Sequence, residues 1–253
     1  RRVLVRSALW PATLGGDPAV RRWDAKANPG LAWVAGGRVA VPLEDGRVVL
    51  ADPAGPAGDR ILAPVGPGAD PFGLAASPDG ATLFATYVKG EIRRWDVASG
   101  ASAALRSGDL PEAERGGPIG IATSPDGRWL CVTAEDAELR LFETSGAART
   151  TLRTESPQTK AVAFAPDGRH LAALGADGRA YLWTVDASGF RRAFSFLPWP
   201  GSSGPENRRA ANWLGWDGPS TLLVALDEAV QRVPLDEGAW QRRAALLDLR
   251  LAP

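Results

Sequence analysis

The sequence has almost no histidine, cysteine or methionine. Its one His is His170, its one Cys is Cys131, and it contains no Met. One Cys excludes an intrachain disulfide and a thiol-based metal site, and one His leaves too few ligands for a zinc or copper site built from His and Cys side chains. Cys131 lies in the apolar run 129–133, so we expect it to be a buried core residue. No metal site and no cofactor are predicted.

Motifs of nucleophilic and phosphate chemistry are also missing. The chain has no Gly-x-Ser-x-Gly sequence, which would hold a nucleophilic serine at a sharp turn, and a Ser-His-Asp arrangement would have to use His170. It has no Gly-x-x-x-x-Gly-Lys-Ser/Thr loop to hold nucleotide phosphates. The sequence therefore predicts a protein that is not an enzyme and has no catalytic residues.

Neither sign of charge is in excess, and no long apolar run is present. The 29 basic residues balance the 29 acidic residues, so no overall field would attract nucleic acid or an anionic membrane. Recurring Arg pairs, such as Arg93-Arg94, lie in strand-like runs, where alternation sends the two side chains to opposite faces. No apolar run reaches the roughly 18 residues typical of a transmembrane helix. We expect no nucleic-acid partner and no direct membrane insertion.

Composition also gives expectations about source and compartment. Only Lys26, Lys89 and Lys160 are lysines among the 29 basic residues, and the chain is rich in Ala, which indicates a GC-rich, bacterial genome. No signal-like segment is visible, which favours a cytoplasmic location. The chain starts at Arg1 and has no Met, so we expect a piece of a longer protein whose targeting segment would lie outside it.

Turn-forming residues are abundant. The 29 Gly and 21 Pro in 253 residues are the frequent breakers that many short strands require, and 45% hydrophobic residues suffice for a large core. The stretch 71–100 shows their use, because the turns Ser77-Pro78-Asp79-Gly80 and Lys89-Gly90 separate three apolar runs. Pro fixes φ, Asp can bond its own backbone and Gly permits a positive φ. This stretch predicts three strands joined by tight turns.

The same order of strands and turns recurs along the chain. Units 118–146 and 159–189 repeat the Ser/Ala-Pro-Asp-Gly turn, and looser copies span 30–55 and 209–238. The glycines of the first turn in each unit are spaced by 43, 47, 41 and 50 residues, and they are Gly37, Gly80, Gly127, Gly168 and Gly218. A repeat of this length, with four strand-like runs per unit, is typical of a propeller blade.

The third run of several units carries a Trp-Asp pair or a relaxed version of it. These are Trp95-Asp96, Trp23-Asp24, Trp183-Thr184 and Phe142-Glu143. On these residues the sequence resembles a WD40-repeat β-propeller over nearly its whole length. WD40 repeats often carry a Gly-His pair before the innermost strand. The one His here opens a second strand instead, so the resemblance is to a divergent relative that lacks the usual His network.

We predict an all-β fold, a single β-propeller of four-stranded antiparallel blades. Six blades are expected, with seven as the alternative, and pairing of the N- and C-terminal segments should close the ring and remove exposed sheet edges. Trp95, Phe142 and Trp183 should pack between neighbouring blades. The predicted blades are, in order, one shared by 1–29 and 248–253, and then 30–66, 71–107, 118–153, 159–197 and 209–247.

Candidate binding residues lie in the turns between second and third strands and in two long connections, 107–117 and 197–209. Because blades radiate about one axis, these turns should share one face, where their carboxylates could ring a cation or a basic peptide. The same residue types are also turn formers, which hairpins such as Asp177-Gly178 require. The predicted partner-binding residues are Asp45, Lys89, Asp136, Asp177, Asp227, Trp199, Arg208 and Arg209.

The resemblance implies a non-catalytic platform for protein-protein interaction, as one domain or subunit of a larger bacterial assembly or of a multidomain signalling protein. Its partners would be proteins. The alternative is a small-ligand or enzyme propeller, lactonase-like or TolB-like, with a carboxylate-lined central site that could hold calcium. The shortage of His argues against that alternative. A rigid spacer within an assembly is a third interpretation, which the sequence does not separate from the first.

Overall fold

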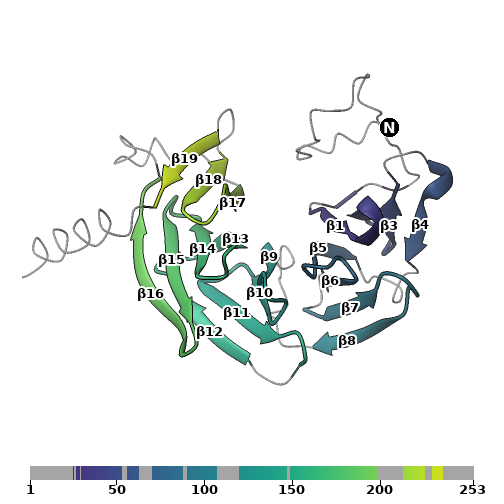
Figure 1. The fold of residues 1–253 in the computed structure, drawn as a ribbon, viewed down its shortest axis with the longest axis horizontal. Coiled ribbons are helices and arrows are strands. Elements are labelled where there is room, and N and C mark those ends of the chain that lie inside the picture. Colours follow the sequence, from purple (N-terminus) through teal and green to yellow (C-terminus); the bar gives the residue numbers. More distant parts are fainter. Residues whose placement is uncertain are drawn as a thin grey trace, which may run out of the picture.

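The structure, a computed structural model, describes ten stretches of the chain. They are residues 25, 27–28, 30–52, 56–62, 70–87, 90–106, 120–146, 149–198, 213–225 and 230–235. Their strands form five antiparallel sheets arranged in an arc around a common centre (Figure 1). No helix among these residues is both long enough and apolar enough to cross a membrane.

Each sheet is a meander whose strands follow sequence order. Sheet 1 contains β1 (Ala32–Val34), β2 (Arg38–Pro42), β3 (Val48–Ala51) and β4 (Arg60–Leu62), with short 3-10 turns at Ala35–Gly37 and Pro56–Gly58. Sheet 2 contains β5 (Pro71–Ala76), β6 (Thr82–Tyr87), β7 (Ile92–Asp96) and β8 (Ser102–Arg106). Sheet 3 contains β9 (Gly120–Thr123), β10 (Trp129–Thr133), β11 (Glu138–Glu143) and β12 (Arg149–Arg153).

The last two sheets complete the arc. Sheet 4 contains β13 (Thr159–Phe164), β14 (His170–Gly175), β15 (Ala180–Asp186) and β16 (Gly189–Phe196), and sheet 5 contains β17 (Trp213–Trp216), β18 (Thr221–Ala225) and β19 (Val230–Pro234). The first strands of successive sheets contact one another, β1 with β5, β5 with β9, β9 with β13 and β13 with β17. These strands therefore line the inside of the arc.

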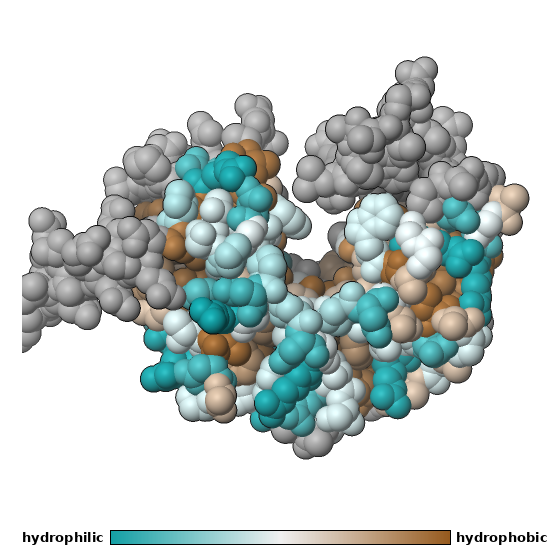
Figure 2. All heavy atoms as spheres, viewed as in Figure 1, coloured by the Kyte–Doolittle hydropathy of each residue, from teal (hydrophilic) through white to brown (hydrophobic). Residues whose placement is uncertain are grey.

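The hydrophobic core lies between neighbouring sheets. Figure 2 shows hydrophobic residues, in brown, gathered between the sheets and hydrophilic residues, in teal, on the surface around them. Trp95 packs toward sheet 1, Phe142 toward sheet 2 and Trp183 toward sheet 3, and each is at most 3% exposed. The predicted packing of these aromatic residues between blades is confirmed. Cys131 is buried in the same way, as expected.

The turn between β5 and β6 shows why the repeated Pro-Asp-Gly sequence builds blades. The amide of Gly80 donates to the carbonyl of Ser77 over 2.8 Å, and the amide of Ala81 donates to Oδ1 of Asp79 over 3.0 Å. Gly80 has a φ of 68°, and a Cβ there would lie 2.4 Å from the amide nitrogen of Ala35 in sheet 1. Glycine thus serves both the turn and the close approach of two sheets.

The meander gives the molecule two faces. Turns between second and third strands, and the connections from one sheet to the next, share one face, which we call the link face. Turns between first and second strands and between third and fourth strands share the opposite face, because successive antiparallel strands reverse direction. The turns that carry Asp45, Asp136 and Asp177 therefore share a face, whereas Lys89 and Asp227 lie outside the described residues.

The number of blades needs correction. The described residues form five sheets, four with four strands and one with three, and not the predicted six or seven blades. The sixth blade was counted from terminal segments, and 1–24 and 248–253 lie outside the described residues, as does the predicted closure. Sheets 1 and 5 form the two ends of the arc (Figure 1). Their innermost strands carry two exposed tryptophans, Trp33 at 52% and Trp213 at 42%.

Candidate functional site

Three of the eight predicted binding residues lie on the link face of the described sheets. Asp45 follows β2, Asp136 follows β10 and Asp177 follows β14, each in the turn that leads to the third strand. The structure brings Asp136 and Asp177 together around the connection between sheets 3 and 4, whereas Asp45 belongs to sheet 1. The other five predicted residues lie outside the described residues, namely Lys89, Asp227, Trp199, Arg208 and Arg209.

The carboxylate of Asp45 is held by Arg47, two residues further on. Oδ1 accepts a hydrogen bond from the amide of Arg47 over 3.1 Å, and Oδ2 accepts one from its Nε over 2.7 Å. The hydrogen bond from the Arg47 side chain holds the pKa of Asp45 below its usual range. Asp45 thus stabilises the turn and carries a charge that Arg47 already balances.

Asp136 has a stronger and more buried partner. Arg140, which is buried, donates from both terminal nitrogens to the two oxygens of Asp136, and its Nη2 also lies 2.9 Å from Oε2 of Glu138. Burial acts to raise the pKa of Asp136, but hydrogen bonds from Arg140 and from the amide of Glu138 outweigh it and lower the pKa. One buried guanidinium therefore joins two carboxylates of the same hairpin.

Asp177 links its turn to the interior of sheet 4. Its Oδ1 accepts a hydrogen bond from the amide of Arg179 over 3.0 Å, and its Oδ2 accepts one from the hydroxyl of Tyr181 over 2.6 Å. Burial, and then this hydrogen bond, raise the pKa of Tyr181 well above its usual value. The tyrosine is held in its neutral form as a donor to the carboxylate.

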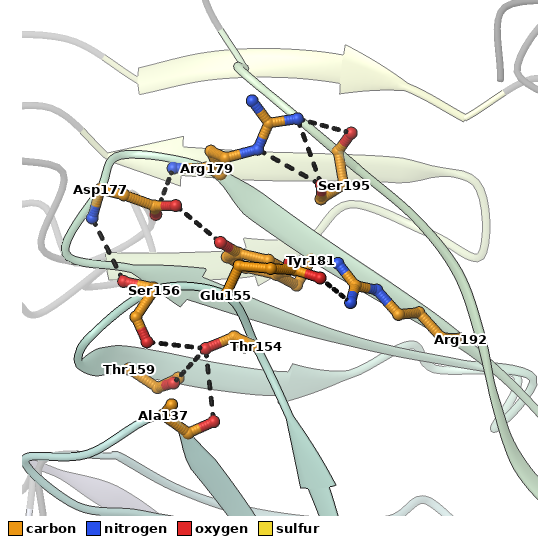
Figure 3. Close-up of polar contacts among 10 residues, drawn as sticks. All are labelled: Ala137, Thr154, Glu155, Ser156, Thr159, Asp177, Arg179, Tyr181, Arg192 and Ser195. Carbon is orange, nitrogen blue, oxygen red and sulfur yellow. Dashed lines mark hydrogen bonds and ion pairs between the residues drawn. The ribbon is translucent and has the colours of Figure 1, made fainter. Parts of the chain in front are cut away.

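The connection between β12 and β13 ties these turns together (Figure 3). The amide of Asp177 donates to Oγ of Ser156 over 3.3 Å, and the amide of Thr159 donates to the carbonyl of Asp136 over 3.0 Å. A Cβ at Gly175 would lie 2.6 Å from Cβ of Ser156, so glycine is needed where the connection crosses the turn. Hydroxyl and amide groups here fix neighbouring sheets to each other.

An exposed ion pair lies at the edge of this cluster. Both terminal nitrogens of Arg192, on β16, donate to the carboxylate of Glu155, in the connection between the sheets (Figure 3). The guanidinium carbon also lies 5.5 Å from the centroid of the Tyr181 ring, within the range of a cation-π contact. The side chains remain 62% and 38% exposed for Glu155 and Arg192. This pair is fixed in position and accessible to a partner.

Three carboxylates in the described turns of the link face are balanced by arginines. Asp45 forms an ion pair with Arg47, Glu91 forms one with Arg93 at 2.6 Å, and Asp136 forms one with Arg140. These arginine partners were not predicted from the sequence, although an acidic residue is followed by Arg two or four residues later in each of the three turns. Asp45, Glu91 and Asp136 therefore act as turn residues with arginine partners, whereas the Asp177 carboxylate is held by Tyr181. Binding by the eight predicted residues stays a prediction.

Metal ligation has no support among the described residues, since they contain no group of three or more His, Cys, Asp or Glu side chains that could hold a metal ion.

Comparisons with known proteins bear on the fold. The sequence profile of the WD40 family, described as WD domain, G-beta repeat, matches residues 149–184, which run from β12 into β15. Comparison with curated proteins finds no match. A chain in a crystal structure of a mitotic checkpoint complex has a similar fold, with a TM-score of 0.62 and 16% sequence identity. The match covers 81% of this chain and 63% of that chain.

The structural likeness concerns fold and not function. Identity of 16% is too low to carry a function, and 1620 chains of solved structures match, so the fold is shared by many proteins. The repeat match, the structural match and the arc of antiparallel sheets together confirm the predicted resemblance. The chain has a β-propeller fold, and its residues 149–184 match the WD40 repeat.

Proposed function

We propose that this protein is a non-catalytic platform for protein-protein interaction and that the link face binds its partner. The observation that carries the proposal is the pair Glu155–Arg192, which is exposed and yet held in one geometry by two hydrogen bonds and by the ring of Tyr181. Side chains that are already ordered lose little conformational entropy on binding. Fixed charges of both signs select a partner with the complementary pattern.

The fold supports the same proposal. Propellers of the WD40 type are generally interaction scaffolds, and the similar solved chain belongs to a multiprotein complex. The protein would then act as one domain or subunit of a larger assembly. Asp45, Asp136 and Asp177 contribute the turns that hold this face in shape, and the remaining predicted residues would extend it.

A charge-swap series tests the platform. The wild type, Glu155→Arg, Arg192→Glu and the double swap are each tagged and used to capture partners from a native lysate, and the captured proteins are identified by mass spectrometry. We expect each single variant and the double swap to lose the partner that the wild type captures. The double swap restores an internal ion pair, so its folding serves as the control. Capture that is equal in all four proteins would show that this face is not the binding surface.

Calcium titration separates the platform from the small-ligand alternative. We expect no saturable heat at micromolar calcium in a calorimeter. Saturable binding would favour a carboxylate-lined ligand site and would contradict a purely protein-binding role.

A further inference from the structure

A crevice of about 320 Å³ lies between sheets 2 and 3 on the side of the opposite face. Its walls come from the ends of β6 and β7 in sheet 2, from the turn before β10, and from the residues that follow β11 in sheet 3. The lining residues are Ser77, Thr82, Phe84, Arg94, Gly127, Thr144 and Ser145.

The crevice exists because sheet 2 differs from sheets 1, 3 and 4 at one strand position. Arg94 directly precedes Trp95, and it pairs with Phe84 of β6. Leucines occupy the register-equivalent positions of sheets 1, 3 and 4, where they are at most 3% exposed, and these residues are Leu50, Leu141 and Leu182. A guanidinium is too costly to bury in that way without a partner, so Arg94 stays exposed and the space between the sheets is left unfilled.

A second position shows the same departure. Thr82 pairs with Asp96, and its equivalents in sheets 3 and 4 are Trp129 and His170. Trp129 packs edge-on against Phe190 of the next sheet, with ring centroids 5.4 Å apart, and His170 stacks on Trp216 at 6.0 Å. Aromatic rings thus fill the space that a small threonine leaves open in sheet 2.

The guanidinium of Arg94 has no carboxylate partner among the described residues. Its neighbour Arg93 points to the other face of the strand, where it pairs with Glu91 at 2.6 Å. Arg232, the register equivalent in sheet 5, pairs with Asp217. Arg94 therefore presents a positive charge to a partly enclosed space without an ion-pair partner among the described residues.

The two acidic residues at the neighbouring strand positions, Asp96 and Glu143, accept hydrogen bonds from residues other than Arg94. Asp96 accepts hydrogen bonds from the amide and the hydroxyl of Ser99, each over 2.6 Å. Glu143 accepts hydrogen bonds from Arg128, the shorter over 2.8 Å. Neither carboxylate is thus paired with Arg94.

We propose that this crevice binds an oxyanion, a carboxylate or a phosphate group, carried on a short chain. Arg94 supplies the ionic hydrogen bonds, which suit the planar geometry of either group. The hydroxyl of Thr82 is a further donor, and the ring of Phe84 forms an apolar wall for the chain that carries the anion. The site lies on the face opposite to the proposed partner surface and does not depend on it.

The first experiment uses inorganic phosphate as the probe. Phosphate is titrated into isotope-labelled protein, and the NMR signals of the Arg94 Nε–H and the Thr82 and Ser145 amides are followed. We expect saturable shifts in the wild type and an affinity loss of about tenfold or more in Arg94→Gln, because hydrogen bonds to charged groups contribute this much. Arg169→Gln is the matched control, since Arg169 is an exposed arginine in a first turn of the same face. It should bind as the wild type does.

A second variant separates loss of the site from loss of the fold. Arg94→Leu introduces the residue type that sheets 1, 3 and 4 carry at this position and should bury its side chain, so we expect a higher Tm together with loss of phosphate binding. Unchanged binding in both Arg94 variants, or an equal loss in Arg169→Gln, would overturn the proposal. If a capped phosphoserine peptide binds more tightly than inorganic phosphate, the natural ligand is an oxyanion carried on a peptide. If the two affinities are equal, the natural ligand is a free anion.

Discussion

Arg140 and Asp136 form a two-point ion pair across one turn of the link face. Nη1 donates to Oδ1 over 3.0 Å and Nη2 donates to Oδ2 over 2.6 Å, while the Arg140 side chain is 7% exposed. A guanidinium so deeply buried depends on its carboxylate partners, Asp136 and Glu138, because an unpaired buried charge is strongly destabilising. The turn residue that the sequence indicated for binding is thus first of all a support of the fold.

Removal of this carboxylate should therefore destabilise the protein. We expect Asp136→Ala to lower the free energy of unfolding by about 2 kcal/mol, below the loss for a fully buried pair, because Asp136 is partly exposed and Glu138 still pairs with Arg140. Asp45→Ala is the control, since its pair with Arg47 is more exposed and should contribute less than about 1 kcal/mol. Urea denaturation measures both values. Equal losses would show that burial of Arg140 does not matter.

Acid should destabilise the protein. Hydrogen bonds lower the pKa values of several carboxyl groups in the folded state, and those from Ser188 and Arg191 lower the pKa of Asp186 to about 2. A group with a lowered folded pKa stabilises the protein above its unfolded pKa and loses that contribution as pH falls through the folded pKa. We expect the urea midpoint to hold steady down to about pH 5 and to fall between about pH 4 and pH 2.

A single variant tests the origin of this acid response. Asp186→Asn removes one of the titrating groups, so its stability should fall less steeply in the same range. If the slope matches that of the wild type, Asp186 is not among the groups that cause the loss.

The two tyrosines should resist ionisation in the folded protein. Burial raises the pKa of Tyr87, and burial together with the hydrogen bond to Asp177 raises that of Tyr181. A raised folded pKa stabilises the protein below the unfolded value and loses this effect as pH rises above it. Tyrosinate absorbance should therefore stay low at about pH 10, whereas the chain unfolded in guanidinium should titrate there. Normal titration of the native protein would contradict the burial of both rings.

The thiol of Cys131 should report on unfolding. It is fully buried, and burial raises its pKa strongly, so the reactive thiolate is suppressed. We expect no reaction with a thiol reagent at about pH 8 in native protein and complete reaction in urea. Cys131→Ser should cost more stability than Cys131→Ala, because an unpaired buried hydroxyl costs about 1–3 kcal/mol. Fast reaction of the native thiol would show that sheets 3 and 4 separate readily.

The sequence by itself determined the repeating parts of the fold. The Pro-Asp-Gly turns, the strand runs and the buried aromatic position of Trp95 depend on residues close together in the chain, so composition and spacing were enough to predict them. The Asp-Gly-Arg turn at Asp45 was readable in the same way, although its arginine was overlooked.

Only the tertiary structure decided which surfaces these parts create. Glu155 and Arg192 meet from positions 37 residues apart, and the crevice at Arg94 needs both the exposed arginine and the small Thr82, which leave space between sheets 2 and 3. The number of sheets was also misjudged, because terminal segments lack the repeated turns from which the blades were counted. Such relationships depend on how sheets stack around the centre. A local pattern of residues fixes each sheet but does not fix the contacts between them.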